Sequence, residues 1–187
     1  PTIGGLLIEP ILGPKGVYFN RPQFLQQVRA LCDRLEIPIF ADEILTSGGR
    51  TGKFFAYQHY EGFEPDFVTF GKGLQVAGVA TVARAGRPNV FNLLPNRVGT
   101  LTAYDEALLK GAQIMKRIKE GNLLKNSEEV GDYFRARLEK CTTVRGKGLL
   151  LYSEKLIAEI RDAGGRLMPP LTFTRQQVDQ LLARICP

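Results

Sequence analysis

Two acids and a lysine stand at the ends of two short apolar runs in the first half of the sequence. The run at residues 37–41 is followed by Asp42 and Glu43, and the run at 67–70 is followed by a Gly-Lys-Gly segment that contains Lys72. Short apolar runs of this kind indicate buried strands of an α/β sheet, and open sheets bind ligands outside the carboxyl ends of their strands. We therefore expect a carboxylate and an amine to face one site.

From these residues alone, two interpretations of Asp42 and Lys72 stay open. In the first, the two side chains form a structural ion pair or lie in water at the loop ends. In the second, a bound group compensates both charges, because an uncompensated charge at a buried strand end is costly. A ring that carries both a nitrogen and an aldehyde fits the second interpretation. Asp42 would hold the protonated ring nitrogen, and Lys72 would form an imine with the aldehyde, as in pyridoxal phosphate enzymes.

Several motifs around these residues resemble those of the class III aminotransferases, which are fold type I pyridoxal phosphate enzymes. The similar segments follow one another in order over nearly the whole chain: EPI at 9–11, ADEI at 41–44, GRTGKFFA at 49–56, PDFVTFGKGL at 65–74, RGKGL at 145–149 and RLMPPLT at 166–172. As a set, they are far more specific than a single glycine-rich loop. The resemblance implies an α/β fold with a mainly parallel sheet in a large cofactor-binding domain, followed by a small α+β domain.

The expected domain boundary follows residue 98. Residues 1–98 would form the C-terminal part of the large domain that binds pyridoxal phosphate, and residues 99–187 the small C-terminal α+β domain. Hydrophobic periodicity, turn residues and capping residues supply the expected elements. The expected strands lie at 3–8, 37–41, 67–70, 76–83, 148–152 and 166–168, with a loop at 10–21. The expected helices begin at Pro22, span 106–118, 127–138 and 154–163, and follow Thr174. Asn126 or Ser127 would cap the helix at 127–138.

The resemblance also assigns roles to five side chains. Lys72 would be the catalytic residue that carries the cofactor and moves the proton, Asp42 would hold the ring nitrogen, and Ile44 would pack on one face of the ring. Thr100 would reach the cofactor phosphate of the partner subunit, although it also reads as an ordinary loop threonine. Arg166 would bind the substrate carboxylate with a guanidinium fork, the alternative being a solvent-exposed arginine on an edge strand.

The activity that the resemblance implies is transamination between an amino acid or amine as donor and a 2-oxo acid as acceptor, in a homodimer with a shared active site. Three departures from the family pattern count against an intact site: Leu45 replaces a common glutamine, Pro14 replaces a common acid, and the segment between residues 151 and 164 is short. Family members are about twice as long, so we expect an N-terminally truncated chain. Other pyridoxal phosphate chemistry (aminomutase, racemase or decarboxylase) or a catalytically inactive truncated homologue are the alternatives.

Composition excludes some other classes of function. The 187 residues are 44% hydrophobic, and the net charge of +6 comes from 25 basic and 19 acidic residues without a dense basic block, so we do not expect nucleic-acid binding. No run is long enough to span a membrane, and no signal peptide is recognised. Cys32, Cys141 and Cys186 lack metal-site spacing, and Cys32 is expected to be a reduced thiol, which predicts a cytoplasmic protein without a metal. His59 is expected to be structural.

Overall fold

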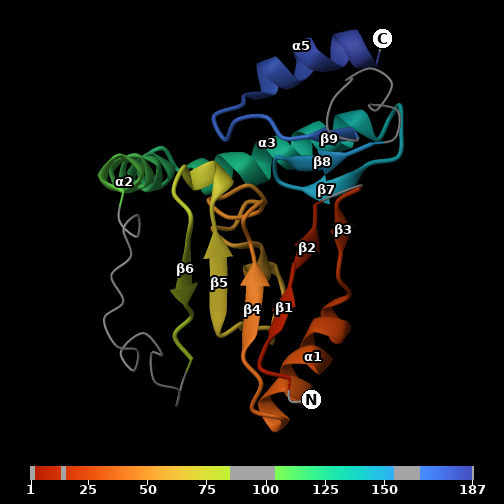
Figure 1. Ribbon diagram of the computed structural model, residues 1–187. Coiled ribbons are helices and arrows are strands. Elements are labelled where there is room, and N and C mark those ends of the chain that lie inside the picture. The colour runs from red at the N-terminus through yellow and green to blue at the C-terminus, as the bar shows by residue number, and fades with distance from the viewer. Residues whose placement is uncertain (1–2, 14–15, 85–103, 154–164, 187) are drawn as a thin grey trace.

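The computed structural model of the chain describes residues 3–13, 16–84, 104–153 and 165–186, and its centre is a four-stranded sheet (Figure 1). The strands lie in the order β1-β4-β5-β6. The neighbours β1, β4 and β5 are parallel, whereas β6 is antiparallel to β5, so the expected mainly parallel α/β sheet is confirmed. The bounds are Leu6–Ile8 for β1, Ile39–Asp42 for β4, Phe67–Phe70 for β5 and Gly78–Thr81 for β6.

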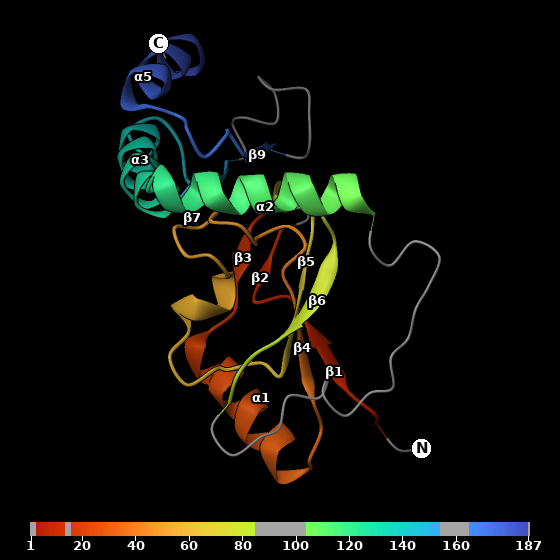
Figure 2. The ribbon, with the colours of Figure 1, turned by 90° about the vertical axis from the view of Figure 1, so that its left-hand side faces the viewer.

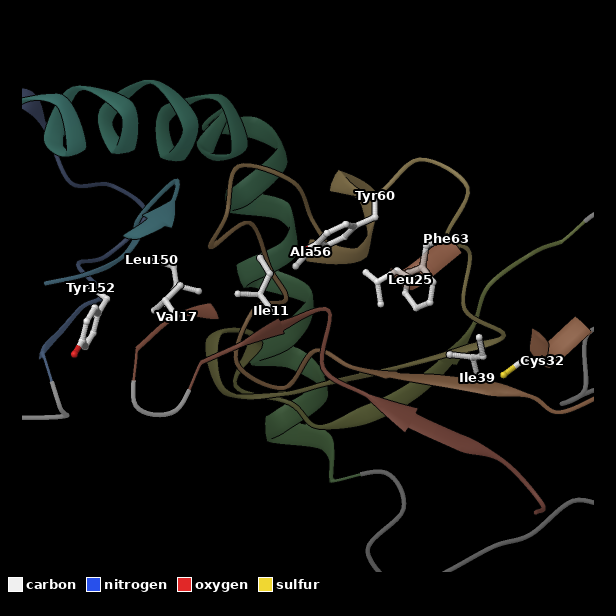
Figure 3. Packing of buried hydrophobic residues seen from close by; sticks show 10 residues of the cluster. All are labelled: Ile11, Val17, Leu25, Cys32, Ile39, Ala56, Tyr60, Phe63, Leu150 and Tyr152. Carbon is white, nitrogen blue, oxygen red and sulfur yellow. The ribbon is translucent and has the colours of Figure 1, made fainter. Parts of the chain in front are cut away.

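Helix α1 (Pro22–Arg34) covers one face of this sheet, and Pro22 opens it as predicted. Its buried residues Leu25 and Cys32 pack in one hydrophobic cluster with Ile39 of β4 (Figure 3). On the opposite face, Leu7 of β1 and Val79 of β6 are 64% and 47% exposed. The strand alternation therefore leaves an apolar second face, which we call the open face, uncovered by the described part of the chain.

Two helices lie across the end of the sheet at which β4 and β5 finish, α2 (Asp105–Glu120) and α3 (Leu123–Leu138) (Figures 1 and 2). The start of α3 differs from the expectation, because neither Asn126 nor Ser127 caps it. The Asn126 amide donates to the Leu171 carbonyl over 2.7 Å, and the Ser127 hydroxyl donates to the Arg50 carbonyl over 3.1 Å. Both polar side chains, which the sequence pattern predicted as helix caps, thus donate to carbonyls of residues distant in the chain.

The C-terminal part combines α3 and a final helix with a three-stranded antiparallel sheet in the order β7-β8-β9. Its elements are β7 (Arg145–Lys147), β8 (Leu150–Tyr152), β9 (Arg166–Leu167) and α5 (Arg175–Ile185). Thr174 caps α5 as predicted, since its hydroxyl accepts a hydrogen bond from the Gln177 amide. The small α+β domain expected at residues 99–187 stays a prediction. The domain boundary after residue 98 and the helix expected at 154–163 lie outside the described residues.

Three short strands escape the sequence analysis. Strand β7 was not predicted, and the segment expected as a loop at 10–21 contains β2 (Ile11–Leu12) and β3 (Tyr18–Phe19), which pair antiparallel. Elements of two or three residues are too short to show a hydrophobic period, so only their pairing defines them.

The cysteines correct part of the expectation about thiols. Cys32 is free and buried, as predicted, but Cys141 and Cys186 form a disulfide that joins the segment after α3 to the end of α5. Spacing gave no sign of this pair because only the fold brings the two residues together. Among the helices that the structure describes, none has the length and apolar composition needed to cross a membrane.

A cluster of four charged side chains ties α1 to the end of the central sheet that lies opposite α2 and α3. Asp66 accepts hydrogen bonds from Arg29 at 2.8 Å, from Arg84 at 2.9 Å and from the Ile39 amide at 2.8 Å, and both arginines also bind Asp33. Burial would raise the pKa of the Asp66 carboxyl, but the hydrogen bonds from Ile39, Arg29 and Arg84 outweigh it and lower the pKa. The charged form of Asp66 therefore stabilises the fold.

We expect Asp66→Asn to lower the free energy of unfolding by about 2–3 kcal/mol at pH 7, because two arginines lose a buried partner. The lowered pKa of Asp66 makes its contribution complete above the unfolded value of 3.8 and lost as the pH falls through the folded value. The difference between wild type and variant in urea unfolding should accordingly shrink at pH 3.

The control is Asp132→Asn, whose side chain is 62% exposed. It should change the free energy of unfolding by less than about 0.5 kcal/mol. A loss in Asp66→Asn that equals the control at pH 7 would contradict the structural role of the cluster.

Candidate active site

Parallel pairing of β4 with β5 sets Asp42 beside Thr69, at the end of the sheet that α2 and α3 cross. Asp42 is half-buried, and its Oδ1 accepts hydrogen bonds from the Thr69 hydroxyl at 3.0 Å and from the Ile44 amide at 3.1 Å. No described residue donates to its other oxygen, Oδ2. The carboxylate is thus held in place while one oxygen stays available to a ligand.

Lys72 lies at the same end of the sheet, in the 3₁₀ turn η2 (Lys72–Leu74) that follows β5 directly. Its φ is 30°, a left-handed conformation that costs a residue with a side chain about 1–3 kcal/mol. Hydrogen bonds from the Leu74 amide to the Gly71 carbonyl and from the Gln75 amide to the Lys72 carbonyl hold this turn. Strained backbone at a chemically active side chain is typical of functional sites.

The described part of the chain contains no salt bridge between Asp42 and Lys72, and Lys72 is exposed. Ile44 lies between their two strand ends, because its Cγ2 is 3.6 Å from the position that a Cβ on Gly71 would take. The side chain of Ile44 is 38% exposed, so it offers an apolar surface beside both charged groups. The structure therefore brings Asp42, Ile44 and Lys72 to one end of two adjacent strands.

Glu43 and Thr69 support the site, and the sequence analysis gave neither a role. The buried Glu43 carboxylate accepts hydrogen bonds from the Thr46 hydroxyl, from the Ala56 amide at 2.7 Å and from the Tyr57 amide at 2.6 Å. Burial raises the pKa of the Glu43 carboxyl, although these donors partly compensate for it. Glu43 thereby closes the glycine-rich loop at residues 46–53, which begins close to Asp42. A polar residue inside the apolar run 67–70 was the available signal for Thr69.

The glycine-rich loop also attaches the C-terminal part to the sheet. The Arg50 carbonyl accepts hydrogen bonds from the Leu149 amide at 3.0 Å and from the Ser127 hydroxyl at 3.1 Å. Gly148, with φ of 56°, packs so closely that a Cβ there would lie 2.6 Å from the carbonyl carbon of Thr51. These hydrogen bonds and the close contact of Gly148 together fix the position of the sheet β7-β8-β9, in which β9 carries Arg166.

Arg166 of β9 reaches the N-terminal part of the chain beside the site. Its Nη1 is 3.8 Å from the position of a Cβ on Gly13, and Leu45 Cδ2 is only 1.8 Å from that same position. Leu45 thus fills the space above Gly13, which only a glycine leaves open. Of the expected site residues, Arg166 lies near the segment that follows Asp42, whereas Thr100 lies outside the described residues.

His59, the single histidine, contacts the glycine-rich loop and not the strand ends. Its Nε2 lies 3.1 Å from the Thr51 carbonyl oxygen and 3.0 Å from the Thr51 hydroxyl. Burial, followed by the charge of Lys147, lowers the pKa of His59 to about 4. A neutral ring bonded to a loop residue agrees with the structural interpretation.

Known proteins share this arrangement of sequence and fold. The family model for aminotransferase class-III matches residues 1–186. An ornithine aminotransferase from Bordetella pertussis is 32% identical over 99% of this chain and 51% of its own length, and an acetylornithine aminotransferase from Methanosarcina mazei is 30% identical over 95% and 50%. The crystal structure of acetylornithine aminotransferase from Elizabethkingia anophelis has a TM-score of 0.80 at 28% identity over 97% of this chain and 55% of that one. The chain spans about half the length of the curated relatives it matches.

We expect Glu43→Gln to lower the free energy of unfolding by about 1–3 kcal/mol, because the amide nitrogen would face backbone donors that the carboxylate now satisfies. The matched control is Glu129→Gln, at a side chain that is 53% exposed and should cost about 0.5 kcal/mol or less. Chemical unfolding of the three proteins at pH 7 measures both. Equal stability of the two variants would show that Glu43 does not hold the loop.

Proposed function

Because this chain belongs to the aminotransferase class-III family, we propose that it contributes to a pyridoxal-phosphate-dependent aminotransferase. The enzyme would transfer an amino group from an amino acid or amine to a 2-oxo acid. The observation that carries the proposal is a pair of groups at adjacent strand ends that no described residue engages, Asp42 Oδ2 and the Lys72 amine, with Ile44 beside both. Class III aminotransferases use this cofactor.

The residues present fit the cofactor. A ring nitrogen that carries a proton needs an anionic acceptor, and Asp42 Oδ2 has no donor among the described residues while Oδ1 is anchored. An aldehyde needs an amine without a competing partner, and Lys72 makes no salt bridge with a described residue. When bound, pyridoxal phosphate supplies a carbonyl carbon that accepts amino groups and a ring that withdraws electrons.

Each side chain would then have one task. Asp42 would keep the proton on the ring nitrogen, because a nearby carboxylate favours the protonated ring. Lys72 would hold the cofactor at rest and afterwards move a proton at the substrate carbon through its Nζ. Ile44 would exclude water from one face of the ring. Arg166 would orient the substrate through two parallel hydrogen bonds to its carboxylate.

The complete site would be shared between two subunits, with Thr100 of one reaching the cofactor phosphate of the other. The apolar open face, with Leu7 and Val79 exposed, supports the presence of further polypeptide against this sheet, since sheets with parallel strands are covered on both faces. We include a homodimer and a cytoplasmic location in the proposal. The free Cys32 supports a reducing location, whereas the Cys141–Cys186 disulfide counts against it, and thiol mapping in intact cells decides between them.

Borohydride reduction after addition of pyridoxal phosphate tests the role of Lys72. We expect mass spectrometry to find the reduced cofactor on Lys72, and Lys72→Ala to lose both this modification and the absorbance of the bound cofactor. Lys125→Ala, at a side chain that is 63% exposed on α3, is the control and should keep both. Labelling at Lys72 no greater than at surface lysines would refute the proposal.

The role of Asp42 has a separate test. We expect Asp42→Ala to weaken cofactor binding about tenfold or more, because the ring nitrogen loses its charged acceptor. Fluorescence titration with pyridoxal phosphate measures the dissociation constant, and unfolding by urea checks that the variant is folded. Unchanged affinity in a folded variant would contradict the contact between Asp42 and the ring.

A further inference from the structure

A cavity of about 370 Å³ lies where the N-terminal part of the chain meets α3 and β7. Four segments line it: the end of β3 with the start of α1, the end of the 3₁₀ helix η1 (Ala56–His59) with Tyr60, the middle of α3, and β7. Asp42, Lys72 and Arg166 lie outside this lining. Cavities that bind small organic molecules typically measure about 300–1,000 Å³, so this one has room for a small ligand.

The inner wall of the cavity is held by hydrogen bonds and packing. Tyr60 is 6% exposed, its hydroxyl donates to the Pro10 carbonyl over 2.9 Å, and it belongs to the hydrophobic cluster of Figure 3. His59 is fixed through its Nε2, which lies 3.1 Å from the Thr51 carbonyl oxygen. Because the wall is already ordered, a ligand would not have to order it on binding.

The charges around the cavity are mainly positive. Lys147 of β7 forms no salt bridge or side-chain hydrogen bond with a described residue. Arg135 of α3 meets Asp132 only at 4.0 Å, and these two side chains are 46% and 62% exposed, so their pairing is weak. Two cations thus face one carboxylate, and an anion would balance the excess.

His59 adds no charge to the lining at neutral pH. Burial, and then the charge of Lys147, lower its pKa to about 4, so the ring is uncharged at pH 7. The influence of Lys147 on His59 also places its ammonium group within electrostatic reach of the inner wall. The remaining charged groups around the ring are Lys53 of the glycine-rich loop and the α3 pair Asp132 and Arg135.

Aromatic side chains line the cavity beside these charges. Phe19 of β3 is 41% exposed although it is large and apolar, and Tyr60 lies in the same lining. Apolar and aromatic walls with a few polar groups that fix orientation are typical of sites for small organic ligands. The lining therefore suits a molecule that has both an apolar ring and an anionic group.

We propose that this cavity binds a small organic anion, with its carboxylate or phosphate on Lys147 and Arg135 and its ring against Phe19 and Tyr60. Such a ligand would contact β3 and the end of η1 on one side and α3 and β7 on the other. It would therefore stabilise the junction between the two parts of the chain, because it binds only where these segments meet.

The single histidine makes a local test possible. In a full chain without a histidine tag, the ring signals in nuclear magnetic resonance come from His59, which lines the cavity. The probes are phenyl phosphate and benzoate, which carry a ring, and inorganic phosphate, which does not. We expect a saturable shift of the His59 signals with at least one ring-bearing probe. Its bound form should also raise the pKa of His59, because the anion offsets the charge of Lys147.

Four variants identify the contacts of the probe that binds. Lys147→Met should weaken its binding about tenfold or more, because the unpaired cation is lost. Phe19→Ala should weaken it about threefold or more without affecting inorganic phosphate. Asp132→Asn should strengthen it, since a carboxylate beside Arg135 is removed. Lys125→Met, at a side chain of α3 that is 63% exposed and outside the lining, is the control and should change nothing.

Unfolding by urea checks each variant, and Lys147→Gln takes the place of Lys147→Met if that variant does not fold. His59 signals that stay unshifted up to millimolar concentrations of both ring-bearing probes would overturn the proposal. Equal loss of binding in the Lys147 variant and the control would do so too. Inorganic phosphate that binds as tightly as the ring-bearing probe would overturn the assignment of an organic ligand. Labelling of Lys72 does not involve this cavity, so the cofactor proposal fails or succeeds separately.

Discussion

The parallel pairing of β4 with β5 is the constraint on which the rest of the site depends. Its register sets Thr69 against Asp42, so that a hydroxyl from one strand fixes a carboxylate on the next. The same pairing brings the turn that carries Lys72 to the end of the sheet where Asp42 stands. A slip of one residue would send both side chains to the wrong face, because successive residues of a strand point in opposite directions.

Buried polar groups at the two ends of the sheet maintain this pairing. At one end, Asp66 and two arginines join α1 to the starts of β4 and β5. At the other end, Glu43 closes the glycine-rich loop on itself. Both carboxylates satisfy backbone amides as well as side chains, so they define the positions of chain segments that hydrophobic contacts alone would leave free to shift.

The glycine-rich loop has a structural role that its composition conceals. Its segment around Arg50 and Thr51 receives the C-terminal part through backbone hydrogen bonds and through Gly148, which leaves no room for a side chain. This contact fixes the small sheet, which includes Arg166 on β9, against the loop. The position of Arg166, for which we propose substrate binding, thus depends on a contact between the glycine-rich loop and Gly148.

The sequence by itself determined most of the longer local elements, and it supplied the prediction for the chemistry of the site. Apolar runs at 37–41 and 67–70, Pro22 and Thr174 marked strands and helix starts that the structure contains, because periodicity and caps are local properties. The tertiary structure alone decided which groups meet. The Ser127 hydroxyl donates to the Arg50 carbonyl and does not cap a helix, and Cys141 forms a disulfide with Cys186. Leu45 fills the space above Gly13, and the Arg145 guanidinium lies between the rings of Tyr18 and Tyr152. These contacts join residues distant in the chain, and their energy exists only once the strands have paired and the loops have closed.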